Sequence, residues 1–308
     1  MRFEDVRGFV FDIDGTLVHR AGPGEVHAIP GAREVLDRIT ASGRPFAAFT
    51  NGSHVEPDAF ARQLRAAGLP VADGQVLTPL CSVQAYLDRL PGNPRVLPFA
   101  TEEARRYLEG AGVHLVDGRD DDGVDAVFVA HADRADFHEL ERAARAVIAG
   151  ARLLTGSYVP AYAGANGPIL SRGAMITAAI AKASSARPIV VGKPSRAAVR
   201  EMGRRLGVPP AEIAVVGDDL RLDVALGHLG RSTTVLVRSG ISGAVDLTRI
   251  PARRRPDVAI GTVAEMLSRD LGLDPVLALD EPVHRLVEVI FVRAFETQRL
   301  AKRGALGS

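Results

Sequence analysis

The sequence G-F-V-F-D-I-D-G-T-L-V, residues 8–18, begins with an apolar run of β-forming residues. Such a run is typical of a buried parallel strand. The chain then changes to two carboxylates one residue apart, Asp12 and Asp14, and Gly15 allows a sharp turn after them. Open α/β sheets bind ligands at the carboxyl ends of their strands, and the two acids lie at that position. The alternative is an ordinary Asp-Gly turn with two solvated acids.

The spacing of Asp12 and Asp14 suits phosphoryl transfer through an aspartyl intermediate. A carboxylate nucleophile divides one difficult displacement into two easier ones. A second carboxyl group can protonate the leaving oxygen and later deprotonate the attacking water. Because both acids repel a phosphate group, this chemistry needs a divalent cation, and Mg²⁺ prefers hard oxygen ligands. It also needs a hydroxyl donor, a basic residue and a further acid, each at another strand end.

Three later strand ends supply those groups. The predicted strand 45–49 is followed by Thr50, Asn51 and Gly52, which offer a hydroxyl and backbone amides. Thr50 is the better phosphate donor by position, whereas Ser53 is expected to cap the next helix. The predicted strand 188–192 is followed by Lys193. Lysine occurs at only three positions, 182, 193 and 302, so we expect a lysine at a strand end to be functional.

The remaining acids follow the predicted strand 213–216. Asp218 is placed to bind a metal, and Asp223 to support either the metal or Lys193 from behind. The sequence leaves two interpretations of Asp219 open, a solvated neighbour of the site or a weak auxiliary metal ligand.

Composition excludes several classes of protein. The chain has 308 residues, enough for one large or two ordinary domains, and 46% hydrophobic with 24% charged residues is typical of soluble globular proteins. A net charge of +1 favours neither nucleic acid nor a membrane surface. We expect no membrane span and no signal peptide, because no apolar run is long enough and acids lie near the N-terminus. The single cysteine, Cys81, indicates a packed residue in a reducing cytoplasm.

Residues 80–187 are predicted to form a small α/β domain inserted into the first. We expect loops at residues 19–28 and 249–255. We expect residues 117–123 to form a polar hairpin turn rather than a calcium loop. A helix is expected at 263–271. The tail 276–308 has apolar residues at helical spacing, which predicts an amphipathic helix that docks on its own core or forms a dimer contact. The other predicted helices are 29–43, 57–68, 82–90, 101–109, 136–149 and 197–206, and the other strands 75–78, 95–99, 113–116, 124–130, 152–155, 233–237 and 258–260.

Four motifs in order, D-I-D-G-T, T-N-G-S, G-K-P and G-D-D-L-R-L-D, resemble those of the haloacid dehalogenase (HAD) superfamily. The resemblance covers roughly residues 7–271 and implies an α/β fold with a doubly wound parallel-sheet core. The long segment between the second and third motifs is similar to the type 2 cap subfamily, which is related to nucleotide-monophosphate, p-nitrophenylphosphate and glycerol-phosphate phosphatases. The expected division is a core of 1–79 and 188–275, an α/β cap of 80–187 and a helical extension of 276–308.

The resemblance also implies roles for the motif residues. Asp12 would be the nucleophile and Asp14 the general acid and base. Thr50, with Asn51 and Gly52, would bind the phosphate oxygens, and Lys193 would stabilise the charge of the transferring group. The Mg²⁺ ligands would be Asp12, Asp14 through its backbone carbonyl, and Asp218, with Asp223 in support.

The cap departs from the pattern of the family. Its expected lip, residues 155–173, lacks the usual T-N-x-D and instead contains Tyr158, Tyr162, Asn166 and Arg172. Aromatic rings can stack on a substrate ring and arginine can hold a second anion, so we expect a substrate larger than phosphoglycolate. The alternative is that the tyrosines pack inside the cap and Arg172 faces water.

The leading hypothesis is therefore a Mg²⁺-dependent phosphomonoesterase that acts on a small phosphorylated metabolite in the cytoplasm. The alternative is a catalytically retired HAD-like domain that binds a phosphorylated ligand or a partner protein. A phosphomutase is disfavoured, because no second phosphate site is evident. Neither nucleic acid nor a membrane is an expected partner, and a homodimer is possible.

Overall fold

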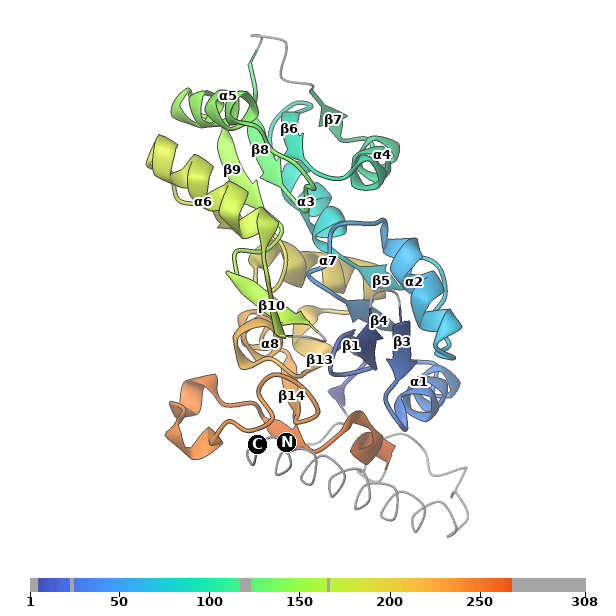
Figure 1. Cartoon of the computed structure of the whole chain (residues 1–308). Coiled ribbons are helices and arrows are strands. Elements are labelled where there is room, and N and C mark those ends of the chain that lie inside the picture. Colours follow the sequence, from blue (N-terminus) through green and yellow to red (C-terminus); the bar gives the residue numbers. More distant parts are fainter. Residues whose placement is uncertain (1–4, 23–24, 117–122, 165–166, 268–308) are drawn as a thin grey trace. The chain divides into compact units, whose positions relative to one another are not determined.

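Two parallel sheets organise the chain in the computed structural model, which describes residues 5–22, 25–116, 123–164 and 167–267 (Figure 1). All the described residues belong to one compact unit. The predicted helix of 276–308 lies outside the described residues, as does most of the expected turn at 117–123. Within the described residues, no helix combines the length and apolar character that a membrane span requires.

The first sheet has six parallel strands in the order β15-β14-β13-β1-β4-β5. Strand β1 pairs with β4 on one side and with β13 on the other, so the chain order reverses between β1 and β13. Such a reversal opens a crevice at the carboxyl ends of the two strands. The strands are β1 (Gly8–Asp12), β4 (Phe46–Phe49), β5 (Val76–Leu77), β13 (Ile213–Gly217), β14 (Thr233–Val237) and β15 (Val258–Ile260).

Both faces of this sheet are covered, as a doubly wound fold requires. Phe9, Val10 and Phe11 of β1 point alternately to opposite faces, yet each is buried. Val10 packs with Ala198 and Met202 in one hydrophobic cluster. The helices that accompany this sheet are α1 (Ala32–Ala41), α2 (Pro57–Ala66), α7 (Arg196–Leu206) and α8 (Ala225–Gly230), whereas α3 (Pro79–Leu87) packs on the second sheet.

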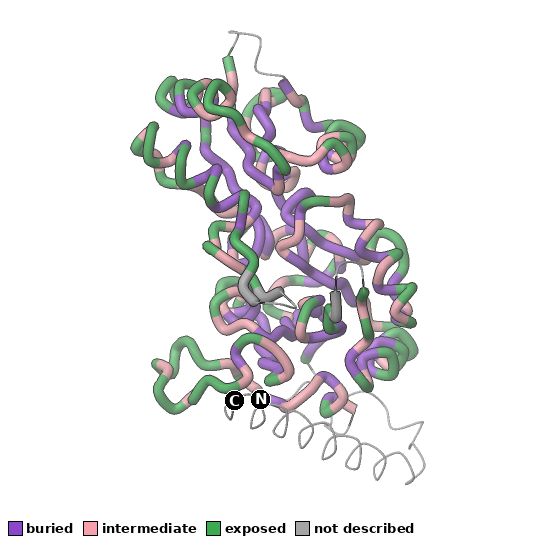
Figure 2. The backbone as a smooth tube through the Cα atoms, in the orientation of Figure 1, coloured by how far each residue is buried: buried purple, intermediate pink, exposed green. Residues whose placement is uncertain are grey.

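The second sheet has five parallel strands in the order β12-β9-β8-β6-β7. It corresponds to the predicted α/β cap, and its strands are mostly buried while the outer faces of its helices are exposed (Figure 2). The strands are β6 (Arg95–Phe99), β7 (His114–Leu115), β8 (Ala126–Val129), β9 (Arg152–Thr155) and β12 (Ile189–Val190), and the helices are α4 (Glu102–Gly110), α5 (Phe137–Ile148) and α6 (Arg172–Ser184).

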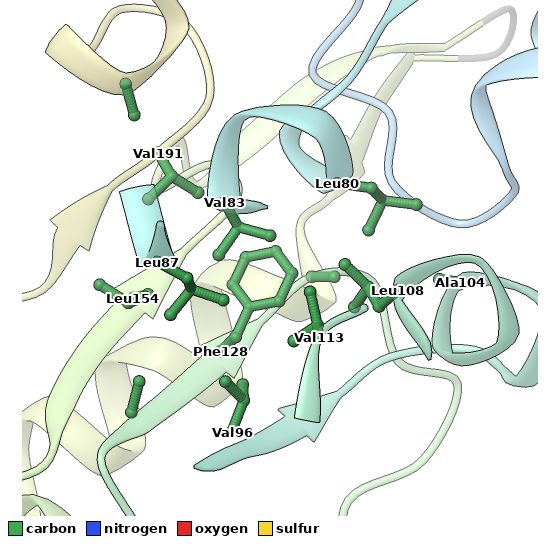
Figure 3. Close-up of a cluster of buried hydrophobic side chains, with 13 residues drawn as sticks. Leu80, Val83, Leu87, Val96, Ala104, Leu108, Val113, Phe128, Leu154 and Val191 are labelled. Atoms are coloured by element: carbon green, nitrogen blue, oxygen red, sulfur yellow. The ribbon is translucent and has the colours of Figure 1, made fainter. Parts of the chain in front are cut away.

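Strand β12, which precedes Lys193, pairs with β9 and so belongs to the second sheet, whereas the sequence division places residue 188 in the core. The exact domain boundaries stay a prediction. A hydrophobic cluster connects this region to α3 and α7 (Figure 3). In it, Val83 and Leu87 of α3 meet Phe128 of β8, together with Val191 and Ala197 from either side of Lys193. The same cluster therefore supports the second sheet and the segment that carries the lysine.

Two antiparallel strand pairs were not predicted from the sequence. Residues expected to form a loop at 19–28 make the antiparallel strands β2 (Val18–Gly22) and β3 (Glu25–Ala28). The lip contains the antiparallel strands β10 (Ala161–Gly164) and β11 (Gly167–Leu170). Strand β3 alternates between exposed and half-buried residues, so it carries no apolar run to reveal it.

Two smaller predictions were wrong. Ser53 does not cap α2, which begins after Glu56 and has Pro57 in its first turn. In place of the helix expected at 263–271, the described part holds only a 3₁₀ turn, Val263–Leu267. Further 3₁₀ turns are Pro210–Glu212, Leu247–Arg249 and Ala252–Arg254, and Leu220–Val224 forms a π turn.

Candidate active site

The reversal point of the first sheet brings three carboxylates together. Asp12 ends β1, Asp218 follows β13, and Asp223 lies in the π turn after it. One ligand oxygen from each of the three residues lies within 4.8 Å of the other two. Hard oxygen ligands at this separation could hold a divalent cation. The predicted convergence of strand ends is therefore present in the folded chain.

Lys193 connects two of these acids. Its Nζ donates to Asp12 Oδ1 at 2.6 Å, to Asp223 Oδ1 at 2.7 Å and to the backbone oxygen of Phe49 at 2.7 Å. The side chain is 2% exposed. An ammonium group has three N–H bonds, so the buried cation is fully hydrogen-bonded. Asp223 thus supports Lys193, one of the two roles that the sequence left open.

The electrostatics of the cluster favour an additional cation. Burial raises the pKa of Asp12, an effect that Lys193 opposes and that Asp223 and Asp218 reinforce. Burial also raises the pKa of Asp218 to about 7, with a further contribution from Asp223. Burial alone would lower the pKa of Lys193, but Asp12 and Asp223 raise it above its ordinary value, so the lysine stays charged. Three acids face one lysine, and a divalent cation would relieve their repulsion.

Glycines leave room for the carboxylates. A Cβ at Gly240 or at Gly15 would overlap Asp218 Oδ2, and one at Gly217 would overlap the carboxylate of Asp223. Gly15 also has φ +84°, which side chains disfavour. The backbone N–H of Ile241 donates to Asp218 Oδ2 at 2.6 Å. The orientation of Asp218 therefore depends on the turn after β14.

The loop after β4 supports Lys193 from the other side. Asn51 donates from Nδ2 to the Lys193 backbone oxygen at 2.8 Å, and its Oδ1 accepts from the Lys193 N–H at 2.7 Å. The Asn51 side chain therefore positions the lysine, which leaves only its backbone amide for a phosphate. Thr50 Oγ1 accepts from the N–H of Gly52 at 3.0 Å.

Asp14 lies in a different environment from Asp12. Its side chain is 48% exposed, and its Oδ1 accepts from Arg20 Nε of β2 at 2.6 Å. Its carboxylate is not part of the three-acid group found among the described residues. An exposed carboxyl group can exchange protons with a leaving group and with water, as a general acid and base must. Asp219 Oδ1 accepts from the backbone N–H of Arg221, which indicates a structural cap.

The predicted cap residues are exposed. Tyr158 and Tyr162 are 43% and 44% exposed, so they do not pack inside the cap. Arg172 donates to Asp133 Oδ1 at 2.8 Å and is about half exposed. Asn166 lies outside the described residues. That these side chains contact the substrate and select it stays a prediction.

Two contributors were missed at the sequence level. Arg20 contacts Asp14, and Ser239 donates from Oγ to the backbone oxygen of Gly15 at 2.7 Å. Ser239 and Gly240 follow β14, the neighbour of β13 in the sheet, so their position at a fifth strand end was a usable signal. Arg20 had no such signal, because its hairpin was read as a loop.

Comparisons with known proteins agree with this geometry. Residues 9–114 match the family model described as haloacid dehalogenase-like hydrolase, and residues 190–266 match one described as HAD-hydrolase-like. Human chronophin is 30% identical over 248 residues, which cover 77% of this chain and 82% of chronophin. The ribonucleotide monophosphatase NagD of Escherichia coli is 29% identical over 261 residues, 85% of this chain and 98% of NagD.

Solved structures extend the likeness to the fold. The 4-nitrophenylphosphatase of Thermotoga maritima has a TM-score of 0.76 and 25% identity, and the match covers 87% of this chain and 98% of that one. The family matches coincide with the segments that carry Asp12, Thr50, Lys193 and Asp218. The chain belongs to the haloacid dehalogenase-like hydrolases and is a phosphatase of their type 2 cap subfamily.

Proposed function

We propose that this phosphatase is a Mg²⁺-dependent phosphomonoesterase that forms an aspartyl-phosphate intermediate on Asp12. The observation that carries the proposal is the position of Lys193 Nζ, which contacts Asp12 and Asp223 beside Asp218 at the reversal point of the sheet. A buried cation and a cluster of acids at one strand edge suit a site that binds a phosphate group and a metal.

The residues present fit a divalent metal. Three carboxylates with raised pKa values converge, and Gly15, Gly217 and Gly240 leave the space that they occupy. Asp12, Asp218 and the backbone carbonyl of Asp14 would hold Mg²⁺, and Asp223 would support the site through Lys193. When bound, the metal would neutralise charge on the phosphate oxygens and make them accessible to an anionic nucleophile.

The protein's own residues would then act in two steps. In the first, an oxygen of Asp12 forms a bond to phosphorus, the ester P–O bond breaks, and Asp14 gives a proton to the departing alcohol. In the second, Asp14 takes a proton from water as the water oxygen attacks phosphorus, and the bond to Asp12 breaks to release phosphate. The Thr50 hydroxyl would hold a phosphoryl oxygen, and so would Lys193 once its hydrogen bond to Asp12 gives way to one with the phosphoryl group.

A small phosphorylated metabolite is the proposed substrate class. Curated relatives include a ribonucleotide monophosphatase and a dihydroxyacetone phosphatase from Corynebacterium glutamicum, which is 26% identical. The exposed rings of Tyr158 and Tyr162 support a substrate with a ring. The pairing of Arg172 with Asp133 weakens the case for a second acidic group, since that ion pair would have to open. A homodimer and a cytoplasmic location remain predictions.

The test is phosphate release from p-nitrophenyl phosphate by the full chain, with Mg²⁺ and with a chelator. We expect turnover only with the metal, and none in Asp12→Asn, because an amide can act neither as the nucleophile nor as an anionic ligand. Asp37→Asn, at an exposed position of α1, is the matched control. Normal turnover in folded Asp12→Asn would refute the proposal, whereas a wild type without turnover on any ester would favour the retired-domain alternative.

A further inference from the structure

A second polar region lies apart from the residues proposed for catalysis. It is a cavity of about 680 Å³ formed by the end of α3, the edge strand β12 with its neighbour β9, and the start of α7. None of the proposed catalytic or metal-binding residues lines it. Its principal lining side chains are Tyr86, Arg89, Arg152, Ile189, Arg196 and Arg200.

The cavity gathers positive charge without compensation. Four arginines line it and no Asp or Glu does. Among the described residues, none of the four forms an ion pair with a carboxylate, and the Arg152 side chain donates to the hydroxyl of Tyr86, at 3.2 Å. The Nε of Arg200 is shielded from solvent and has no hydrogen-bond partner there. Because the whole chain carries a net charge of only +1, this concentration is local.

The arrangement is unfavourable for the protein alone. Arg196 is the first residue of α7, where the positive end of the helix dipole disfavours a cation. Arg200 follows four residues later on the same helix face, and like charges at that spacing repel. Burial, together with Arg89 and Arg196, lowers the pKa of Arg200. An anion in the cavity would relieve all of these effects.

The wall of the cavity is well supported. Tyr86, Leu90 and Ile189 are partly buried and pack on the hydrophobic cluster drawn in Figure 3, in which Leu87 and Val191 are labelled. Arg152 therefore projects from strand β9 and Arg196 and Arg200 from helix α7, whereas Arg89 lies in the turn after α3. Such a packed wall places several guanidinium groups around one volume before any ligand arrives, which reduces the entropy lost on binding.

We propose that this cavity binds a small molecule with two or more phosphate groups, either an inorganic polyphosphate or a nucleoside polyphosphate. Guanidinium groups match phosphate oxygens in bidentate geometry. Four of them from three elements suit a ligand with several adjacent anionic groups rather than one. The partly buried ring of Tyr86 and the side chain of Ile189 offer apolar surface to a nucleoside, if the ligand carries one.

The test is calorimetric titration of full-length Asp12→Asn, which cannot turn the probes over, with tripolyphosphate and with the β,γ-imido analogue of ATP. We compare this parent with variants that add Arg196→Gln and Arg200→Gln together, or Arg253→Gln as a control. Arg253 is an exposed arginine outside the cavity, so its removal changes the net charge without changing the site.

We expect the double substitution to weaken binding of both probes at least tenfold and Arg253→Gln to leave it unchanged. Because the double substitution removes a repulsion, the melting temperature should not fall, which excludes misfolding as the cause. Equal affinity for the two probes would identify the phosphate chain as the ligand, and tighter binding of the nucleotide analogue would add nucleoside contacts. No binding at millimolar concentration, or binding that survives the double substitution, would overturn the proposal. Either result would leave the phosphatase assignment untouched.

Discussion

The two parallel sheets are built alike but differ in the residues at the ends of their strands. Both are parallel, both reverse their strand order, and both are flanked by helices. In the first, the residues that follow or end the strands at the reversal are Asp12, Thr50 and Asp218. In the second, β6, β8 and β9 are followed by Ala100, Ala130 and Gly156, which cannot titrate or ligate through a side chain. Topology supplies a crevice in each sheet, and only the residues at the strand ends supply chemistry.

Burial separates the two regions as well. Lys193, Asp218 and Asp223 are each buried, and each is balanced by a neighbour. The ion pair near the strand ends of the second sheet, Arg172 with Asp133, is instead exposed. Since exposed ion pairs contribute little and buried charges without partners are costly, changes in the first region should have the larger effects.

The largest effect is expected from Lys193→Ala. It leaves Asp12 and Asp223 buried without their cation, which should cost about 3–5 kcal/mol of unfolding free energy. It also removes a donor to the phosphoryl group, which should lower kcat by about 10²–10³-fold. Chemical denaturation and steady-state kinetics measure the two effects. Lys182→Ala, at the end of α6, is the control, and equal effects of both variants on kcat would show that the cation has been misplaced.

Gly240→Ala should have the next largest effect, because the new Cβ would overlap Asp218 Oδ2. We expect Asp218 to turn away and Mg²⁺ affinity to fall by about 10–100-fold, as is typical when the support of a metal ligand is lost. The rise of melting temperature with added Mg²⁺ measures this without turnover. Gly110→Ala is the control, since a Cβ there meets nothing. An unchanged response to Mg²⁺ in Gly240→Ala would mean that Asp218 is not a ligand.

The same contrast explains what the sequence could predict. Asp12, Lys193 and Asp218 could be identified because each follows a short apolar strand and chemistry limits which residue types can act there. The hairpins β2–β3 and β10–β11 could not be identified, because they contain exposed residues and show no regular apolar pattern. The sequence also did not predict the sheet to which β12 belongs, because the pattern of a two-residue strand does not indicate which strand it pairs with.

A smaller effect is expected at the cap, and it should concern selectivity. Tyr158→Ala and Arg172→Ala should change the ratio of kcat/KM between esters with and without a ring, while turnover of p-nitrophenyl phosphate persists. Loss of the exposed ion pair to Asp133 should cost at most about 1 kcal/mol of stability. A panel of phosphate esters measured for both variants checks this. Unchanged ratios in both would show that these side chains do not read the substrate.

The smallest effect is expected at the contact between the two regions, where His54 faces His131. Their ring centroids lie 5.7 Å apart, and His54 also meets the edge of Phe60 at 5.3 Å. Burial lowers the pKa of His54, and His131 and Arg20 lower it further, while Glu103 and Asp14 partly oppose them. The unfolded chain therefore binds a proton at this residue more readily than the folded chain.

The sign of the pH dependence follows. Below the ordinary histidine pKa of about 6.5, the unfolded state takes up the proton first, so stability present at neutral pH is lost as the solution is acidified. His54→Gln should reduce the fall of melting temperature between pH 7.5 and 5.5. His138→Gln, at an exposed position of α5, should leave that fall unchanged. An identical fall in wild type and His54→Gln would show that the contact between the two histidines does not sense protons in this range.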